Sequence, residues 1–342
     1  MRRVVVLGGG QQGKVIATDL ARDFEVTVAD VRPLAFAQPN VHAVQADLAD
    51  APTLVRLAAS HDLTVGALPA RLGFRAAQAA IEAKRPYVDV AFFAEDAAAL
   101  HADAQRAGIA LLPDCGLAPG LTNLIVGRAL AERPRDTIRV CVGGVAQDQS
   151  LPYGYVVTWS LEDLCDEFKR PARIIRGGRV VSLPATSELE PVHVEGAGAM
   201  EAFLTDGLRT LLDCQGVREM TEKTLRWPGH VAAVKPLVDS GRFVEEIGTR
   251  CRQGADLVAF RIDVDGVTVT MVDRAAGGLT AMARTTALTA AAFARLVASG
   301  LVRDSGVVAP ESIGRDKVAY RFILGAVAAS GIHFSPALPF CD

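Results

Sequence analysis

The chain has 342 residues, 50% of them hydrophobic, and a formal net charge of −3. This length predicts about two domains, and the hydrophobic share is sufficient for a sizeable buried core. The near-neutral charge, without a basic run, argues against nucleic acid as a partner. No apolar segment is long enough to span a bilayer, and the first residues lack the pattern of a secretory signal. We therefore expect a cytoplasmic protein that does not bind membranes.

Six cysteines are scattered along the chain, with no C-x-x-C pair among them. They are Cys115, Cys141, Cys165, Cys214, Cys251 and Cys341. This spacing predicts free thiols, as in a protein of the cytosol. Histidines do not lie at ligand spacing from these cysteines, so we expect no metal site.

The most informative motif follows the first apolar stretch of the chain. Gly8, Gly10 and Gly13 have the G-x-G-x-x-G spacing. Gly8 allows a tight turn, Gly10 lets the backbone approach a pyrophosphate, and Gly13 lets the next helix pack closely on the strand. Gln11 and Gln12 begin that helix, whose N-terminal N–H groups and dipole favour phosphates. The motif predicts a dinucleotide site.

The second expected strand, residues 25–29, ends at Asp30. A carboxylate at this place accepts the ribose hydroxyls of NAD and repels the 2′-phosphate of NADP. Arg32 lies just beyond and can reach such a phosphate, stack on adenine or remain a solvated charge. NAD is therefore the expected cofactor, and NADP is the less favoured one. A glycine-rich turn that binds no nucleotide is the simpler alternative.

Two further loops are candidates for cofactor contacts. Asp47 and Leu48 follow the third expected strand, and Leu68 and Pro69 follow the fourth. In a sheet of this kind we expect the first pair beside the adenine and the second pair beside the nicotinamide. An ordinary exit from strand to loop explains the second pair almost as well.

The order of the expected strands and helices predicts the fold class. Over residues 1–120 strands and helices alternate, which is typical of a Rossmann-type doubly wound parallel sheet. Residues 121–304 differ, with a β-hairpin expected around Asp265-Gly266, and favour an inserted α+β domain. We expect residues 305–342 to return to the first domain. The expected class is thus α/β with two domains.

Several segments carry a resemblance to a known family. They are residues 114–123, 152–160, 206–211, 220–230 and 280–286. The first resembles the Gly-x-x-Pro-Gly segment of the saccharopine dehydrogenase-like family, and the second resembles its tryptophan–serine segment. The other three are similar to the L-lysine 6-dehydrogenase branch, also called lysine dehydrogenase. The resemblance covers essentially the whole chain.

This resemblance implies NAD-dependent oxidative deamination of the ε-amine of L-lysine. The product is allysine, which cyclises to piperideine-6-carboxylate. The resemblance also implies a nucleotide domain that is split in sequence, and an inserted α+β domain that carries the catalytic and dimerisation contacts. It implies a homodimer or a larger homo-oligomer.

Such chemistry requires a clamp for the substrate carboxylate and a proton acceptor. Arg226, in the segment most similar to the lysine dehydrogenase branch, is our candidate for the bidentate clamp. A structural arginine, paired with an acid of its own domain, is the equal alternative. His230 and Lys223 are the candidate proton acceptors, although a solvated surface charge explains Lys223 better.

The cationic amine of the substrate calls for a carboxylate or an aromatic face. Asp166 and Glu167, on the helix expected after Trp159, and Asp89, at a strand end, are the candidate carboxylates. Trp159 or Tyr153 can supply a cation–π surface. For Trp159, plain core packing is at least as good an explanation.

Two other functions stay open at this point. Saccharopine reductases and carboxynorspermidine dehydrogenases act on a secondary amine and often use NADPH, against which Asp30 counts. A nucleotide-binding sensor without turnover is the other alternative. The aromatic and arginine-rich middle of the chain argues against a sensor.

Overall fold

The computed structural model describes residues 2–341, which form two compact units. The first unit contains the residues up to Leu124 together with Thr286–Val327, and the second contains Ile125–Thr285 and the residues from Ala328 onward. The chain changes unit inside helices α5 (Leu121–Glu132), α9 (Ala281–Ala298) and α11 (Lys317–Ala329). The first unit therefore includes residues 286–304, and the second includes the residues from Ala328 onward. The sequence-based domains instead place residues 121–304 in the second domain and residues 305–342 in the first.

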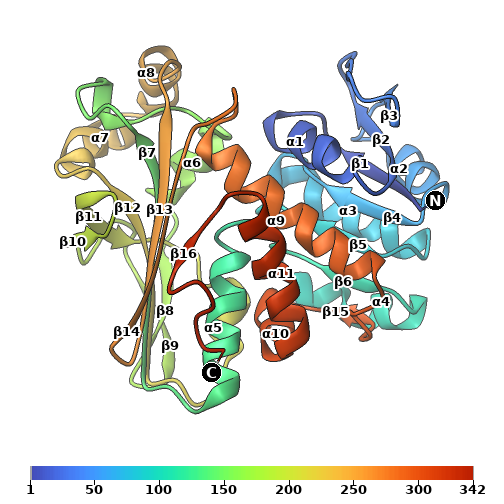
Figure 1. Ribbon diagram of the computed structural model, residues 1–342. Helices are drawn as coiled ribbons and strands as arrows, with labels where there is room; N and C mark the ends of the chain where they lie inside the picture. The colour runs from blue at the N-terminus through green and yellow to red at the C-terminus, as the bar shows by residue number, and fades with distance from the viewer. Residues whose placement is uncertain (1, 342) are drawn as a thin grey trace. The chain divides into compact units, whose positions relative to one another are not determined.

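The first unit is built on a parallel sheet with the order β15-β6-β5-β4-β1-β2-β3 (Figure 1). Its strands are β1 (Arg3–Leu7), β2 (Glu25–Asp30), β3 (Val41–Gln45), β4 (Leu63–Gly66), β5 (Tyr87–Asp89), β6 (Ala110–Leu112) and β15 (Gly306–Val307). The order reverses between β1 and β4, and ligands of open α/β sheets bind outside the carboxyl ends at such a point. The Rossmann-type sheet that the sequence predicts is confirmed.

Helices cover both faces of this sheet. The helical elements of the unit, besides the shared ones, are α1 (Gln11–Leu20), α2 (Ala51–Ala59), α3 (Ala70–Glu82), η1 (Ala97–Leu100), α4 (His101–Ala107) and α10 (Pro310–Arg315). Buried side chains of α2, α3 and α4 form one cluster with Val5 and Leu7 of β1. Val4 and Val6 point to the opposite face and are equally buried. An apolar strand without polar breaks is thus explained by burial on two sides.

The second unit is built on a mixed sheet with the order β10-β11-β12-β7-β13-β14-β16, to which the hairpin β8–β9 is attached through β12. Its strands are β7 (Thr137–Ala146), β8 (Ala172–Arg176), β9 (Arg179–Leu183), β10 (Glu190–Val194), β11 (Gly198–Leu204), β12 (Glu219–Arg226), β13 (Asp256–Val264), β14 (Val267–Arg274) and β16 (Phe334–Ser335). β7 and β12 are parallel. The predicted hairpin is confirmed, because β13 and β14 pair in antiparallel register around Asp265-Gly266.

Short helices pack beside this second sheet. They are η2 (Pro152–Gly154), α6 (Leu161–Glu167), η3 (Arg209–Asp213), α7 (His230–Asp239) and α8 (Phe243–Arg250). Side chains of α6, α7 and α8 form a buried cluster with Phe203 of β11. Ser160 caps α6 by accepting the Asp163 N–H at 3.3 Å. Glu201 accepts the N–H groups of Gly229 and Val231, both at 2.8 Å, and so fixes the start of α7 directly after β12.

Candidate functional site

The glycine turn between β1 and α1 has the geometry of a nucleotide-binding loop. Gly8 has φ +99°, which favours glycine, and a Cβ atom on Gly13 would lie 1.8 Å from the Gly8 carbonyl oxygen. A Cβ atom on Gly10 would meet no atom within 4 Å. The loop is therefore closed on the side of the sheet and open at Gly10. Open space there is what a pyrophosphate close to the backbone requires.

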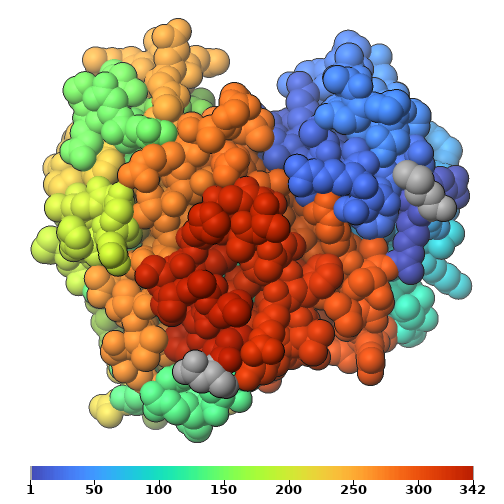
Figure 2. Space-filling model, viewed as in Figure 1, coloured from blue at the N-terminus to red at the C-terminus, as the bar shows by residue number. Residues whose placement is uncertain are grey.

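The N-terminus of α1 faces this opening without a side-chain cap. Gly10 is the N-cap residue and makes no side-chain hydrogen bond, and the first turn holds no acidic residue. Gln11 is exposed and Gln12 is half-buried. N–H groups of a first turn lack partners inside the helix, so the start of α1 can bind an anion. In Figure 2 the blue N-terminal segment reaches the surface of the first unit.

Asp30 ends β2 beside this loop and is 7% exposed. Its carboxylate accepts the Gly9 N–H at 2.7 Å and the Arg32 N–H at 2.9 Å, and the Arg32 Nε lies 3.0 Å away. Burial alone would raise the pKa of Asp30, but the hydrogen bonds from Arg32 and Gly9 lower this pKa to about 2. Asp30 is thus a fixed negative charge at the edge of the glycine turn.

The two other pairs of predicted cofactor contacts differ in accessibility. Asp47 is exposed and accepts the Ala49 N–H at 2.9 Å, whereas Leu48 belongs to the hydrophobic core. Leu68 is buried, and Pro69 is exposed as the N-cap residue of α3. Asp47 and Pro69 are therefore the members of these pairs that a ligand reaches more easily.

Asp89 ends β5 and is fully buried. Its carboxylate accepts the Tyr87 hydroxyl and the Ala91 N–H. The Asp89 carbonyl oxygen accepts the Cys115 N–H at 2.7 Å. Burial raises the pKa of the Cys115 thiol, and the neighbouring carboxylates of Asp114, Asp89 and Glu311 raise it further. The thiol is therefore protonated at neutral pH, and Asp89 is held by contacts within its own unit.

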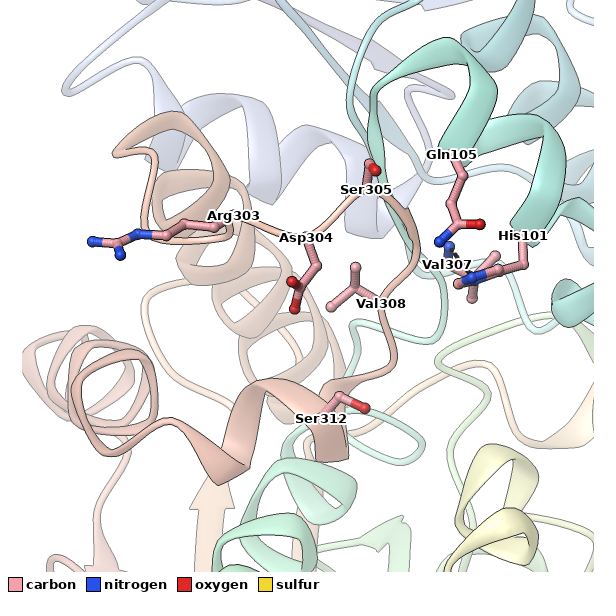
Figure 3. Close-up of a pocket in the computed structure, with 8 residues that line it drawn as sticks. All are labelled: His101, Gln105, Arg303, Asp304, Ser305, Val307, Val308 and Ser312. Carbon is pink, nitrogen blue, oxygen red and sulfur yellow. Dashed lines mark hydrogen bonds between the residues drawn. The ribbon is translucent and has the colours of Figure 1, made fainter.

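A surface pocket of about 440 Å³ lies elsewhere on the first unit, at the edge strand β15 (Figure 3). Its lining residues are His101, Gln105, Arg303, Asp304, Ser305, Val307, Val308 and Ser312. His101 Nδ1 accepts the Val307 N–H at 3.1 Å. None of the site residues predicted from the sequence lines this pocket.

In the second unit, Arg226 ends β12 and is 3% exposed. Its Nη2 lies 3.3 Å from Glu167 Oε2, its Nη1 donates to the Leu225 carbonyl oxygen at 2.9 Å, and its guanidinium carbon lies 5.2 Å from the centre of the Tyr155 ring. The buried Nε has no hydrogen-bond partner among residues 2–341. Arg226 is thus paired with an acid of its own unit and retains one unused donor.

His230 is the first residue of α7 and is 5% exposed. Its Nδ1 donates to the Tyr153 carbonyl oxygen at 2.8 Å, and the rings of Tyr155 and Phe168 lie beside it. Burial lowers the pKa of His230 to about 3, and the charge of Arg226 contributes. A general base works best with a pKa near the working pH, so this environment does not favour His230 as the proton acceptor.

Lys223 and Asp166 lie in different surroundings from His230. Lys223 is buried, and its ammonium group contacts the Glu190 carboxylate and donates to the Glu188 carbonyl oxygen at 2.6 Å. Lys223 is therefore a buried cation in an ion pair and not a solvated surface charge. Asp166 is exposed on α6, and its neighbour Glu167 is the residue that contacts Arg226.

The aromatic candidates belong to the cluster around α6, α7 and α8. Tyr153 is half-buried, and its hydroxyl donates to Glu246 Oε1 at 3.0 Å. Trp159 is half-buried too and packs against this cluster. The ring that lies against the Arg226 guanidinium is Tyr155, which the sequence did not single out. Burial raises the pKa of Tyr155 to about 12, so its hydroxyl stays protonated.

Glu222 is a titratable group that the sequence did not single out. It is 6% exposed, and its Oε2 accepts the Thr205 hydroxyl at 2.6 Å. Burial raises the pKa of Glu222 to about 8, helped by the charges of Glu167 and Asp206. The alternation of side chains along a strand could have indicated Glu222, because residues 222 and 226 of β12 share one face of the sheet.

Other kinds of site find no support in the described residues. Nowhere within residues 2–341 do three or more His, Cys, Asp or Glu side chains gather in an arrangement able to hold a metal ion. Over the same residues, no helix combines the length and the apolarity that crossing a membrane requires.

Comparison with known families gives two matches that cover most of the chain. Residues 4–112 match the family described as Saccharopine dehydrogenase NADP binding domain. Residues 116–332 match the family described as Saccharopine dehydrogenase C-terminal domain.

Curated relatives and solved structures agree with these matches. Saccharopine dehydrogenase (NADP(+), L-glutamate-forming) of Saccharomyces cerevisiae is 23% identical over 265 residues, and that of Schizosaccharomyces pombe is 24% identical over 267 residues. Each alignment covers 72% of this chain and 59% of the relative, so the chain spans about three fifths of their length. A structure of apo saccharopine dehydrogenase (L-Glu forming) from S. cerevisiae has a TM-score of 0.76 at 19% identity, and covers 97% of this chain and 98% of that one. This likeness shows a shared fold.

Proposed function

Because the chain belongs to the saccharopine dehydrogenase family, we propose that it is a pyridine-nucleotide-dependent dehydrogenase that oxidises a carbon–nitrogen bond of an amino acid. Within this class, we assign the reaction to the ε-amine of L-lysine, as the resemblance of residues 220–230 implies. The balanced reaction converts L-lysine, NAD⁺ and water into allysine, NADH, ammonium and a proton.

Asp30 is the observation that carries the choice of NAD. An ionised carboxylate beside the glycine turn accepts ribose hydroxyls and repels a 2′-phosphate. The charge of Arg32 is already paired with Asp30, which leaves it less available to a phosphate. The curated relatives are named for NADP(+), so this choice separates the chain from them.

The residues that fit the cofactor are those of the glycine turn, the start of α1 and Asp30. The bound nicotinamide supplies the hydride acceptor, and the chain supplies position and electrostatics. Gly10 leaves room for the pyrophosphate, and the open first turn of α1 donates to it.

The substrate contacts of the proposal lie on one face of β12. Arg226 holds the α-carboxylate of lysine, for which its unpartnered Nε is suited. We assign the proton acceptor to Glu222 instead of His230, Lys223 or Asp166. A carboxylate with a pKa near 8 takes a proton from an amine at mildly alkaline pH, whereas His230 with a pKa near 3 does so poorly.

One observation favours a second candidate function. Both first curated relatives are named saccharopine dehydrogenases, which act on a secondary amine. In that case the carboxylate on Arg226 belongs to one half of a two-part substrate.

The test is to mix purified protein with NAD and L-lysine at mildly alkaline pH and follow the absorbance of NADH. Parallel reactions contain NADP in place of NAD, and saccharopine in place of lysine. We expect a lysine-dependent rise with NAD that exceeds the rise with NADP. A rise with saccharopine alone would transfer the proposal to the second candidate.

We also propose, from the family resemblance, that the protein is a cytoplasmic homodimer or larger homo-oligomer. Light scattering coupled to gel filtration measures the mass of the assembly directly. A monomeric mass at micromolar concentration would contradict this part of the proposal.

A further inference from the structure

The pairing of Arg226 with Glu167 is unusual for a structural ion pair. Arg226 comes from the end of β12 and its side chain is 4% exposed, while Glu167 ends α6 and its side chain is 26% exposed. The two meet through a single contact of 3.3 Å between Nη2 and Oε2. Arginine and a carboxylate frequently form two parallel hydrogen bonds. This pair uses one, and its acidic member is partly open to solvent.

The second observation is the unused donor on Arg226. Its Nε is buried and has no hydrogen-bond partner among residues 2–341. Its Nη1 is satisfied by the Leu225 carbonyl oxygen, and the Tyr155 ring lies 5.2 Å from the guanidinium carbon. A buried charged donor without a partner is costly and rare in folded proteins. The guanidinium is thus held in place with one position ready for an acceptor.

Other charged groups lie around the pair. Glu167 and Glu222 interact electrostatically, and Glu167 interacts with Arg226. Asp206, the next carboxylate, is already matched by Arg173 through two contacts of 2.9 Å. Burial raises the pKa of Glu167, while the charges of Arg226 and Arg170 act in the opposite direction.

We propose that Arg226 and Glu167 form a subsite for the zwitterionic head group of a free α-amino acid. The α-carboxylate binds Arg226 through Nε and Nη2, and the α-ammonium binds the Glu167 carboxylate that Nη2 releases. One internal ion pair is exchanged for two pairs with the ligand, so charge stays balanced. This inference deepens the proposed function and relies on it for the identity of the reacting amine.

The subsite predicts how the protein selects among amines. L-Lysine carries both head-group charges, 6-aminohexanoate lacks the α-ammonium, and cadaverine lacks the carboxylate. The reacting amine is the same in all three compounds. Differences between them therefore report on the head-group subsite alone.

The kinetic test compares these substrates in Glu167→Gln, Arg226→Lys and the wild type. Glu167→Gln should raise KM for lysine by about 10-fold, the value of one charge-assisted contact. It should leave KM for 6-aminohexanoate unchanged or lower it, because this ligand has no α-ammonium to pair with the Glu167 carboxylate that Arg226 releases. Arg226→Lys should raise KM for lysine and for 6-aminohexanoate, and leave that for cadaverine unchanged. Glu162→Gln, an exposed acid on the same helix, is the matched control. Equal effects of Glu167→Gln on lysine and 6-aminohexanoate would overturn the subsite.

A binding measurement separates this inference from the proposed function. L-Norleucine has the same head group and no ε-amine, and hexanoate has the carboxylate alone. Calorimetry with each, in the presence of NADH, should show that Glu167→Gln weakens norleucine binding about 10-fold and does not weaken hexanoate binding. If Glu167→Gln leaves the affinity for norleucine unchanged, the proposed subsite is wrong. If the wild type binds norleucine in the expected pattern but oxidises no lysine, the proposed function fails and the subsite stands. Thermal unfolding of each variant checks that it is folded.

Discussion

The Asp30 carboxylate accepts the backbone N–H of Gly9 at 2.7 Å, which fixes the acid at the rim of the glycine turn. Replacing Asp30 with serine should lower kcat/KM for NAD by about 10- to 100-fold, because contacts of a charged acceptor to the ribose are lost. Discrimination against NADP should fall in parallel. Steady-state kinetics with both cofactors measure the ratio. Arg32→Ala is the matched control, and a ratio that moves with Arg32 instead of Asp30 would contradict this assignment.

Two glycines of the turn should respond in opposite ways to the same substitution. Gly13→Ala places a Cβ atom 1.8 Å from the Gly8 carbonyl oxygen, so the first unit must distort and the melting temperature should fall. Gly10→Ala meets no atom within 4 Å, so the melting temperature should stay unchanged. NAD affinity of Gly10→Ala should nevertheless drop, because the methyl group occupies the space for the pyrophosphate. Calorimetry and fluorescence titration with NAD check the pair. Unchanged NAD affinity in Gly10→Ala would show that the cofactor does not bind at this loop.

Local sequence patterns predict the features of the first unit better than those of the second. The glycine turn and Asp30 lie on neighbouring elements of a repetitive βα pattern, so spacing along the chain locates them. The hairpin at Asp265-Gly266 is equally local, and its turn is confirmed. β15 and β16 are two-residue strands that form by pairing with distant strands, and no local pattern predicts them.

The polar groups of the second unit depend on tertiary packing. From the sequence, a solvated surface charge is the better explanation of Lys223. In the structure Lys223 pairs with Glu190, which comes from another strand. Glu167 of α6 contacts Arg226 of β12, although the two residues are 59 positions apart in the sequence. Burial shifts the pKa values of His230 and Glu222 in opposite directions, and burial is a property of the fold.

His230 should make the protein sensitive to acid. Its pKa is about 3 in the folded protein and 6.5 in a model compound, so the unfolded chain binds the extra proton between these values. Stability should therefore fall as pH decreases from about 6.5 to about 3, by at most about 5 kcal/mol. His230→Asn, which can still donate to the Tyr153 carbonyl oxygen, should lose this dependence. Urea unfolding of both proteins at pH 7 and pH 4.5 measures it, and parallel losses would show that His230 is not the cause.

Glu222 should act in the opposite direction at higher pH. Its pKa is raised from 4.5 to about 8, so the folded protein keeps a proton that the unfolded chain releases. The stabilisation is complete below about pH 4.5 and is lost as pH rises to about 8, by at most about 5 kcal/mol. Glu222→Gln should abolish this loss in urea unfolding between pH 5 and pH 9.

The same variant tests the role of Glu222 as the proton acceptor. In the wild type, kcat/KM should rise as pH increases through about 8, because the ionised carboxylate is the active form. In Glu222→Gln this rise should disappear, with kcat reduced by about 100-fold or more. A pH profile that keeps its alkaline rise in Glu222→Gln, and loses it in His230→Gln, would restore His230 as the acceptor.

In the proposed reaction, hydride passes from carbon 6 of L-lysine to NAD. The most direct measurement is mass spectrometry of the reduced cofactor formed from L-lysine that carries deuterium on carbon 6. Hydride transfer from carbon 6 predicts NADH that is heavier by one deuterium, and unlabelled NADH from lysine that carries deuterium on carbon 2 instead. Label transferred from carbon 2, or no reduction of NAD by either compound, would contradict it.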